Sequence, residues 1–87
     1  MPELTQRFLQ ASEDAKKLPR RPEHDALLKL YALYKQGLEG DVRGTKPGFF
    51  DFIGTAKYEA WSQLKGMSGD DAMRKYIELA ESLKALG

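Results

Sequence analysis

Two tyrosines and two lysines carry the most suggestive chemistry in this sequence. Tyr31 and Tyr34 lie three residues apart with Lys35 directly after the second, and Lys57 precedes another tyrosine. A tyrosine ring can stack on a purine while its hydroxyl donates to a phosphate, and lysine supplies the opposing charge. This combination would suit an amphiphile with an aromatic, phosphorylated head and an apolar tail. Spacing alone does not establish such a ligand, because a helical lysine beside an aromatic ring usually covers it with its aliphatic stem.

Other residues give weaker indications of chemistry. His24 is the only histidine and the chain has no cysteine, so neither a metal centre nor a catalytic triad is expected. Asp41 and Asp51 flank a glycine-containing loop, and Asp51 is better explained as a helix cap than as half of an acid–base pair. The glycines of that loop lack the spacing of a phosphate-binding loop. We therefore expect no catalytic residue, no metal site and no cofactor.

The composition fits one small domain. The 87 residues, 41% of them hydrophobic, suffice for one compact core, and we expect a single domain over residues 1–87. A formal net charge of +1 gives no basis for a general affinity for nucleic acid or anionic membranes. The sequence lacks an apolar run of about 18 residues and an apolar leader. With the absence of cysteine, these features predict a cytoplasmic protein without stable membrane insertion.

Apolar residues recur every three or four positions in four segments, which predicts four helices and no strand. The first helix should run from about Leu4 to Leu18 and end at the prolines of LPRRP. The second should run from about Glu23 to Leu38, and its apolar arc is too wide for a single packing partner. Two neighbouring helices, or one neighbour and a ligand, would cover this arc.

A long loop, Glu39 to Asp51, follows the second helix and has no periodicity. Phe49 and Phe50 are expected to pack this loop against the rest of the domain. Asp51 can cap a third helix, and Ser68 can open the fourth with a capping box. The residues therefore predict an all-α fold, a single four-helix bundle.

Several short motifs, read in order, resemble those of the acyl-CoA-binding protein family. They are LYALYKQ at residues 30–36, GD at 40–41, KPGFFDFIGTAKYEAW at 46–61, LKGMS at 64–68 and DAMRKYI at 71–77. Each motif is weak alone, but the ordered set covers nearly the whole chain. The resemblance implies a four-helix bundle of the acyl-CoA-binding protein type that binds medium- to long-chain fatty acyl-CoA thioesters one to one. It also implies an intracellular acyl-CoA carrier and pool former that does not turn its ligand over.

The resemblance further implies which residues form the site. Those expected to hold the head group of the acyl-CoA are Lys16, Tyr31, Tyr34, Lys35, Lys57 and Tyr76. Those expected to line the cleft for the acyl chain are Phe8, Leu27 and Leu28. The sequence departs from the usual family pattern at Ile53 and Thr55, where lysines are frequent, and at Tyr58, where tryptophan is frequent. The two missing positive charges predict a weaker salt dependence of binding than is usual for the family.

A second interpretation stays open at this point. The protein could be a helical interaction module whose wide second helix docks the amphipathic helix of a partner protein. An enzyme is the least favoured interpretation. For the carrier, the expected partners are the acyl-CoA ligand and, transiently, acyl-CoA-using enzymes. No nucleic acid is expected, and the carrier should be a monomer.

Overall fold

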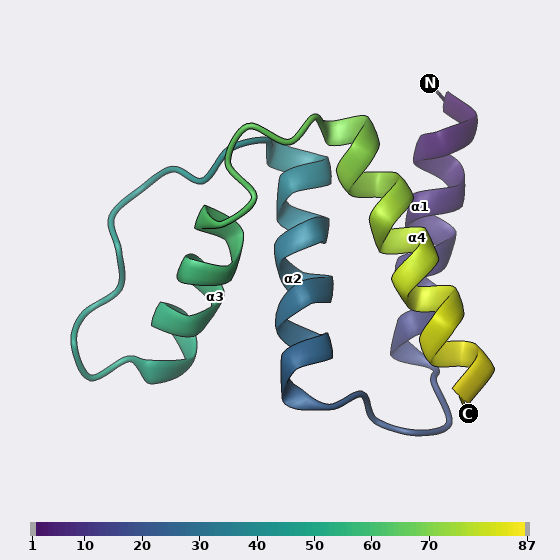
Figure 1. Ribbon diagram of the computed structural model, residues 1–87, viewed down its shortest axis with the longest axis horizontal. Coiled ribbons are helices and arrows are strands. Elements are labelled where there is room, and N and C mark those ends of the chain that lie inside the picture. The colour runs from purple at the N-terminus through teal and green to yellow at the C-terminus, as the bar shows by residue number, and fades with distance from the viewer. Residues whose placement is uncertain (1, 87) are drawn as a thin grey trace.

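The computed structural model describes residues 2–86, which form four helices joined by loops (Figure 1). The helices are α1 (Pro2–Lys16), α2 (His24–Glu39), α3 (Phe52–Ser62) and α4 (Gly69–Leu86). No strand occurs between residues 2 and 86, so the predicted all-α fold is confirmed. The predicted domain, residues 1–87, also includes Met1 and Gly87, which lie outside the described residues.

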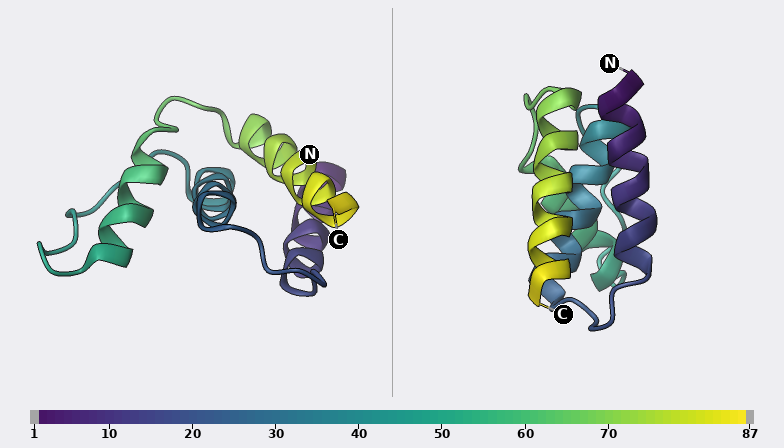
Figure 2. Two further views of the ribbon diagram at one scale, coloured as in Figure 1. Left: turned by 60° about the horizontal axis from the view of Figure 1, so that its bottom comes forward. Right: turned by 90° about the vertical axis from the view of Figure 1, so that its right-hand side faces the viewer.

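The helix α2 lies between α3 on one side and α4 on the other, and α1 packs on α4 (Figure 2). These two helical neighbours explain the wide apolar arc of α2. The helices α2 and α3 run in the same direction, as do α1 and α4 (Figure 1). Because α2 and α3 are parallel, residues 40–51 must carry the chain from one end of the molecule back to the other, which explains the long loop. The molecule is flat, with extents of 36 × 30 × 15 Å.

Phe8 of α1 lies at the centre of the core, with 0% of its surface exposed. Its ring packs on those of Tyr34 in α2 and Tyr76 in α4, at centroid distances of 5.3 and 5.2 Å. Three helices therefore meet at one aromatic cluster, in which tilted and edge-on rings gain more than area burial alone provides. The other buried members of this core are Leu4, Ala11, Leu30, Leu33, Ala72, Ile77 and Ala80.

Two helix starts are held by the side chains that the sequence indicated. The Gly54 amide donates to Asp51 Oδ1 at 2.9 Å, and the Asp71 amide donates to Ser68 Oγ at 3.1 Å. Each bond satisfies a backbone N–H that has no acceptor within its own helix. Asp51 and Ser68 thus set where α3 and α4 begin.

The loop between α2 and α3 is held by side chains of α3. The Trp61 indole N–H donates to Gly40 O at 2.8 Å, and the Tyr58 hydroxyl donates to Gly44 O at 3.0 Å. Tyr58 is one of the departures from the usual family pattern, and its hydroxyl makes the second of these bonds. The departure therefore has a structural role in this chain.

Phe49 and Phe50 do not pack the loop against the domain. They are 83% and 85% exposed, and their rings contact each other edge-on at 5.2 Å. The prediction from the sequence is wrong at this point. The two rings lie at the turn that precedes α3. The only helix with which α3 makes extensive contacts, among those described, is α2. Among residues 2–86, no second helix packs extensively on α3 to receive these rings.

A buried polar side chain joins α2 to the connection between α3 and α4. Gln36, which is fully buried, donates through Nε2 to Asp41 Oδ1 and to Met67 O, each at 2.9 Å. The same carboxylate oxygen accepts the Gly66 amide at 2.8 Å. The hydrogen bond from the Gly66 amide is the largest cause of a lowered pKa at Asp41, and the hydrogen bond from Gln36 lowers this pKa further. Gly66 has a φ of 94°, which glycine adopts without a steric penalty. Asp41 therefore has a structural role.

Candidate ligand-binding site

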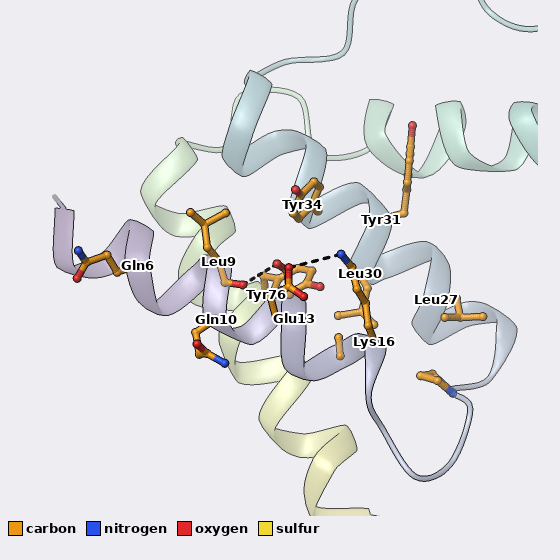
Figure 3. Close-up of a pocket in the computed structure, with 13 residues that line it drawn as sticks. Gln6, Leu9, Gln10, Glu13, Lys16, Leu27, Leu30, Tyr31, Tyr34 and Tyr76 are labelled. Atoms are coloured by element: carbon orange, nitrogen blue, oxygen red, sulfur yellow. Dashed lines mark hydrogen bonds and ion pairs between the residues drawn. The ribbon is translucent and has the colours of Figure 1, made fainter.

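A cleft of about 820 Å³ opens between α1 and α2, with Tyr76 of α4 at its floor (Figure 3). A cleft of this size, with apolar walls and a few polar groups, is typical of a small-molecule site. The residues of α1 that line it are Gln6, Leu9, Gln10, Ser12, Glu13, Ala15 and Lys16. Those from α2 and the loop before it are Pro22, Leu27, Leu30, Tyr31 and Tyr34.

Three tyrosines line the cleft, and two of them, Tyr34 and Tyr76, pack on the core. The ring centroids of Tyr34 and Tyr76 are 6.0 Å apart, and the buried Phe8 ring packs against both. Burial raises the pKa of the Tyr76 hydroxyl, and the neighbouring Tyr34 adds to the shift. The Tyr76 hydroxyl therefore stays protonated at neutral pH and keeps a proton to donate.

Side chains of α2 and α3 meet in two matched pairs. The Lys57 Nζ lies 5.2 Å from the centre of the Tyr31 ring, and the Lys35 Nζ lies 4.9 Å from the centre of the Trp61 ring. On α2, Tyr31 and Lys35 are four residues apart, and on α3 the corresponding pair, Lys57 and Trp61, has the same spacing. Each helix therefore presents its two residues on one face. Because α2 and α3 run in the same direction, the pairs follow one another along the interface (Figure 1). We call these four residues the α2–α3 surface, and it holds two ammonium groups.

Lys35 has a second neighbour on its own helix. Its ammonium group forms an ion pair with Glu39 Oε2, and Arg43 Nη2 lies 3.1 Å from Glu39 Oε1. One carboxylate thus bridges two cations, one through each oxygen. The hydrogen bond from Lys35 is the largest cause of a lowered pKa at Glu39, so this carboxylate is ionised at neutral pH.

Lys16 lies at the end of α1 and at the edge of the cleft. Its Nζ lies 3.6 Å from Glu13 Oε1, and Figure 3 shows this pair over the cleft. Both side chains are exposed. Exposed ion pairs contribute little to stability, so a ligand anion can recruit Lys16 at small cost.

The structure divides the predicted head-group residues between two adjoining regions. Four of them line the cleft: Lys16, Tyr31, Tyr34 and Tyr76. Lys35 and Lys57 lie on the α2–α3 surface instead. Tyr31 belongs to both regions, because the residue lines the cleft and its ring contacts Lys57.

The three residues predicted to line the acyl-chain cleft are placed differently from one another. Leu27 lines the cleft, and Phe8 lies behind it in the core. Leu28 lines a separate groove of about 620 Å³, with Ala56 and Ala60 of α3 among its walls. With 3.6 residues per turn, consecutive helical residues point about 100° apart, so Leu27 and Leu28 face different walls.

Several lining residues of α1 were missed by the sequence analysis. Leu9 and Ser12 are two of them, and they precede the predicted Lys16 at steps of three and four, so all three share a face of α1. This spacing was available as a signal, but Leu9 and Ser12 lie beside the core stripe and carry no distinctive chemistry. Glu39 was also missed, although its distance of four residues from Lys35 predicts a helical ion pair.

The described residues contain no group of three or more histidine, cysteine, aspartate or glutamate side chains placed to hold a metal ion. His24 is exposed at the start of α2. Among residues 2–86, none of the helices combines the length and the apolar character that crossing a membrane requires.

Comparison with known proteins identifies close relatives. The sequence matches the model of the family described as acyl CoA binding protein over residues 5–80. It is 48% identical to acyl-CoA-binding protein homolog 1 of Caenorhabditis elegans over 82 residues, which cover 94% of this chain and 95% of that protein. It is 44% identical to the acyl-CoA-binding protein of Saccharomyces cerevisiae, with 94% of each chain covered.

Solved structures share the fold. The crystal structure of Oryza sativa acyl-CoA-binding protein 2 superposes with a TM-score of 0.91 at 35% identity, over 95% of this chain and 92% of that chain. The solution structure of the yeast acyl coenzyme A binding protein gives a TM-score of 0.74 at 44% identity, over 91% of this chain and 92% of that chain.

Proposed function

We propose that this chain, which belongs to the acyl-CoA-binding protein family, binds medium- to long-chain fatty acyl-CoA thioesters one to one and carries them without a catalytic step. The observation that carries the proposal is the position of Tyr31. Tyr31 lines the cleft, and its ring lies under the Lys57 ammonium group, so one residue joins an apolar space to a cationic surface. An acyl-CoA thioester has the same two parts, an apolar chain and a phosphorylated adenine nucleotide.

We assign the head group to the six residues implied by the family resemblance. The tyrosine rings offer faces on which adenine can stack and hydroxyls that can donate to phosphate oxygens. The 3′-phosphate of the ribose is a dianion, and the α2–α3 surface presents Lys35 and Lys57 from two different helices. Two charge-assisted partners would distinguish this phosphate from a free hydroxyl. Lys16 supplies a third cation on the α1 side of the cleft.

We assign the acyl chain to the apolar walls of the cleft. Leu27 and Leu30 of α2 and Leu9 of α1 line it, and the Phe8 ring forms part of the core behind. Burial contributes about 0.8 kcal/mol per CH₂ group, so affinity should rise with chain length until the walls are fully covered. Leu28 stays a predicted contact of the acyl chain. Because it lines a separate groove, only an acyl chain that extends out of this cleft would touch it.

Binding and release would leave the thioester unchanged. A chain held in the cleft is shielded from water and from membranes, which is what a carrier and pool former requires. The alternative of a helical interaction module gains no support from the relatives, which are named as acyl-CoA-binding proteins. We also propose a single domain over residues 1–87, a monomer, a cytoplasmic location and transient contacts with acyl-CoA-using enzymes.

Calorimetric titration with palmitoyl-CoA, palmitate and CoA alone tests the proposal. Palmitoyl-CoA should bind with a stoichiometry of one and far more tightly than either part, since only the intact thioester engages the cleft and the α2–α3 surface together. The proposal fails if palmitate binds as tightly as palmitoyl-CoA, because the head-group residues would then contribute nothing.

A further inference from the structure

Glu39 lies where it can interfere with the phosphate contact of Lys35. It occupies the last position of α2, four residues after Lys35, and its carboxylate takes up the ammonium group that we assign to the 3′-phosphate. The side chains of Lys35 and Glu39 are 25% and 31% exposed, so solvent screens this pair less than a fully exposed one. A phosphate that approaches Lys35 therefore meets a cation that is already paired and a carboxylate of the same sign as itself.

We infer that Glu39 is a specificity-determining residue that sets the affinity for the phosphorylated head group by competing with the phosphate for Lys35. The inference rests on the proposed function, since it needs Lys35 to contact the phosphate. It concerns a residue outside the six that we assign to the head group. Glu39 touches Lys35 rather than the ligand, so its effect is exerted through the ammonium group and through charge repulsion.

Arg43 gives the competition a second partner. Its Nη2 lies 3.1 Å from Glu39 Oε1, whereas Lys35 pairs with the other oxygen, Oε2. When the phosphate takes Lys35, the Glu39 carboxylate can keep its contact with Arg43 instead of being left unpaired. Arg43 therefore lowers the cost of releasing Lys35, and its removal should make Glu39 a stronger competitor.

The charge state of Glu39 supports this role. Lys35 and Arg43 hold the pKa of Glu39 below its usual value, so the carboxylate is ionised throughout the neutral range. The ring of Trp61, 4.9 Å from the Lys35 Nζ, keeps the ammonium group over the α2–α3 surface while it is paired with Glu39. Release of Lys35 would then need only a change of anionic partner, because cation–π contact with Trp61 can persist.

The decisive experiment is a calorimetric titration of Glu39→Gln with palmitoyl-CoA and with its analogue that lacks the 3′-phosphate. Removing the competing charge should tighten palmitoyl-CoA binding about three- to tenfold, in the range expected for one partly screened ion pair and one repulsion. The affinity for the analogue should change less than about twofold, because the analogue has no 3′-phosphate with which Glu39 could compete for Lys35. The matched control is Glu59→Gln, which removes the same charge from α3, where Glu59 pairs with Lys46 at 2.9 Å.

Arg43→Gln and the double variant separate competition from direct contact. The single variant should weaken palmitoyl-CoA binding, whereas adding Arg43→Gln to Glu39→Gln should have little further effect. A loss of equal size in both backgrounds would mean that Arg43 binds the phosphate itself and would overturn its assigned role.

The inference and the proposed function fail in different ways. If Glu39→Gln binds palmitoyl-CoA no better than Glu59→Gln does, while the wild-type protein still prefers the phosphorylated ligand, Glu39 is not a competitor. If the wild-type protein binds both ligands equally, the assignment of Lys35 to the phosphate is itself wrong.

Discussion

The ammonium group of Lys57 on α3 lies 5.2 Å from the centre of the Tyr31 ring on α2. The contact joins two parallel helices at the point where the cleft adjoins the α2–α3 surface. A cation and a ring that are already held together lose little further freedom when a ligand engages both. The arrangement therefore favours a ligand whose head group is both anionic and aromatic over a ligand that is only one of the two.

Lys57→Ala tests the contribution of this cation. The substitution should weaken palmitoyl-CoA binding about 10- to 100-fold, because a hydrogen bond to a charged group contributes about 1.5–3 kcal/mol. Lys84→Ala is the charge-matched control, since Lys84 is exposed on α4 and lies outside both the cleft and the groove of Leu28. Equal affinities of the two variants, measured by calorimetry, would remove Lys57 from the site.

Tyr31→Phe separates the hydroxyl from the ring. The variant keeps the aromatic face under Lys57 and the wall of the cleft, so its thermal unfolding should match that of the wild-type protein. Affinity for palmitoyl-CoA should fall about three- to tenfold, as expected for the loss of one hydrogen bond. Unchanged affinity would leave the ring as packing only.

Asp41→Ala tests the polar junction that joins α2 to the connection between α3 and α4. The substitution removes the acceptor for the Gly66 amide and for Gln36, so the free energy of unfolding should fall, as measured by urea denaturation at pH 7. The pKa of Asp41 is lowered in the folded protein, from an ordinary value of 3.8. Its ionised form therefore stabilises the fold above that value, and this contribution is lost as the pH falls through the lowered pKa.

The pH dependence supplies the check on Asp41. The difference in unfolding free energy between the wild-type protein and Asp41→Ala should be constant from pH 7 to about pH 5 and should shrink towards about pH 2. A difference that is as large at the acidic end as at pH 7 would show that the charge of Asp41 plays no part.

Phe50→Ser and Phe8→Ala compare an exposed phenylalanine with a buried one. Phe50 is 85% exposed, so a polar replacement should leave the unfolding free energy within about 0.5 kcal/mol and should improve solubility. Phe8 is fully buried among three helices, so its truncation should cost about 3–5 kcal/mol. A loss of more than about 2 kcal/mol for Phe50→Ser would show that its ring packs against the domain after all.

The helices and their starts are predictable from the sequence because their determinants are local. The apolar periodicity identifies four helices, and Asp51 and Ser68 make the capping bonds expected of them. The observed bounds of α2, His24–Glu39, differ from the predicted ones by one residue at each end. The spacing of Tyr31 and Lys35 likewise places both side chains on one helix face.

Features that depend on what lies opposite are not predictable in this way. Phe49 and Phe50 have the chemistry of core residues, but whether a partner stands across from them is decided by the tertiary arrangement of α2 and α3. Leu27 and Leu28 have identical side chains, and only the position of the neighbouring helices assigns them to different grooves. The ion pair of Glu39 with Lys35 can be read from the sequence, but such pairs are common, and its significance depends on Trp61 and Arg43.

The proposed binding mode is tested most directly by NMR of the isotope-labelled protein during titration with palmitoyl-CoA, in which each backbone amide reports its own surroundings. The shifts should saturate at one equivalent and should be largest around Leu27, Tyr31 and Lys57, where the cleft adjoins the α2–α3 surface. The groove that includes Arg20 and Leu83 should be unaffected. Shifts that are largest in that groove, or that never saturate, would contradict binding in the cleft.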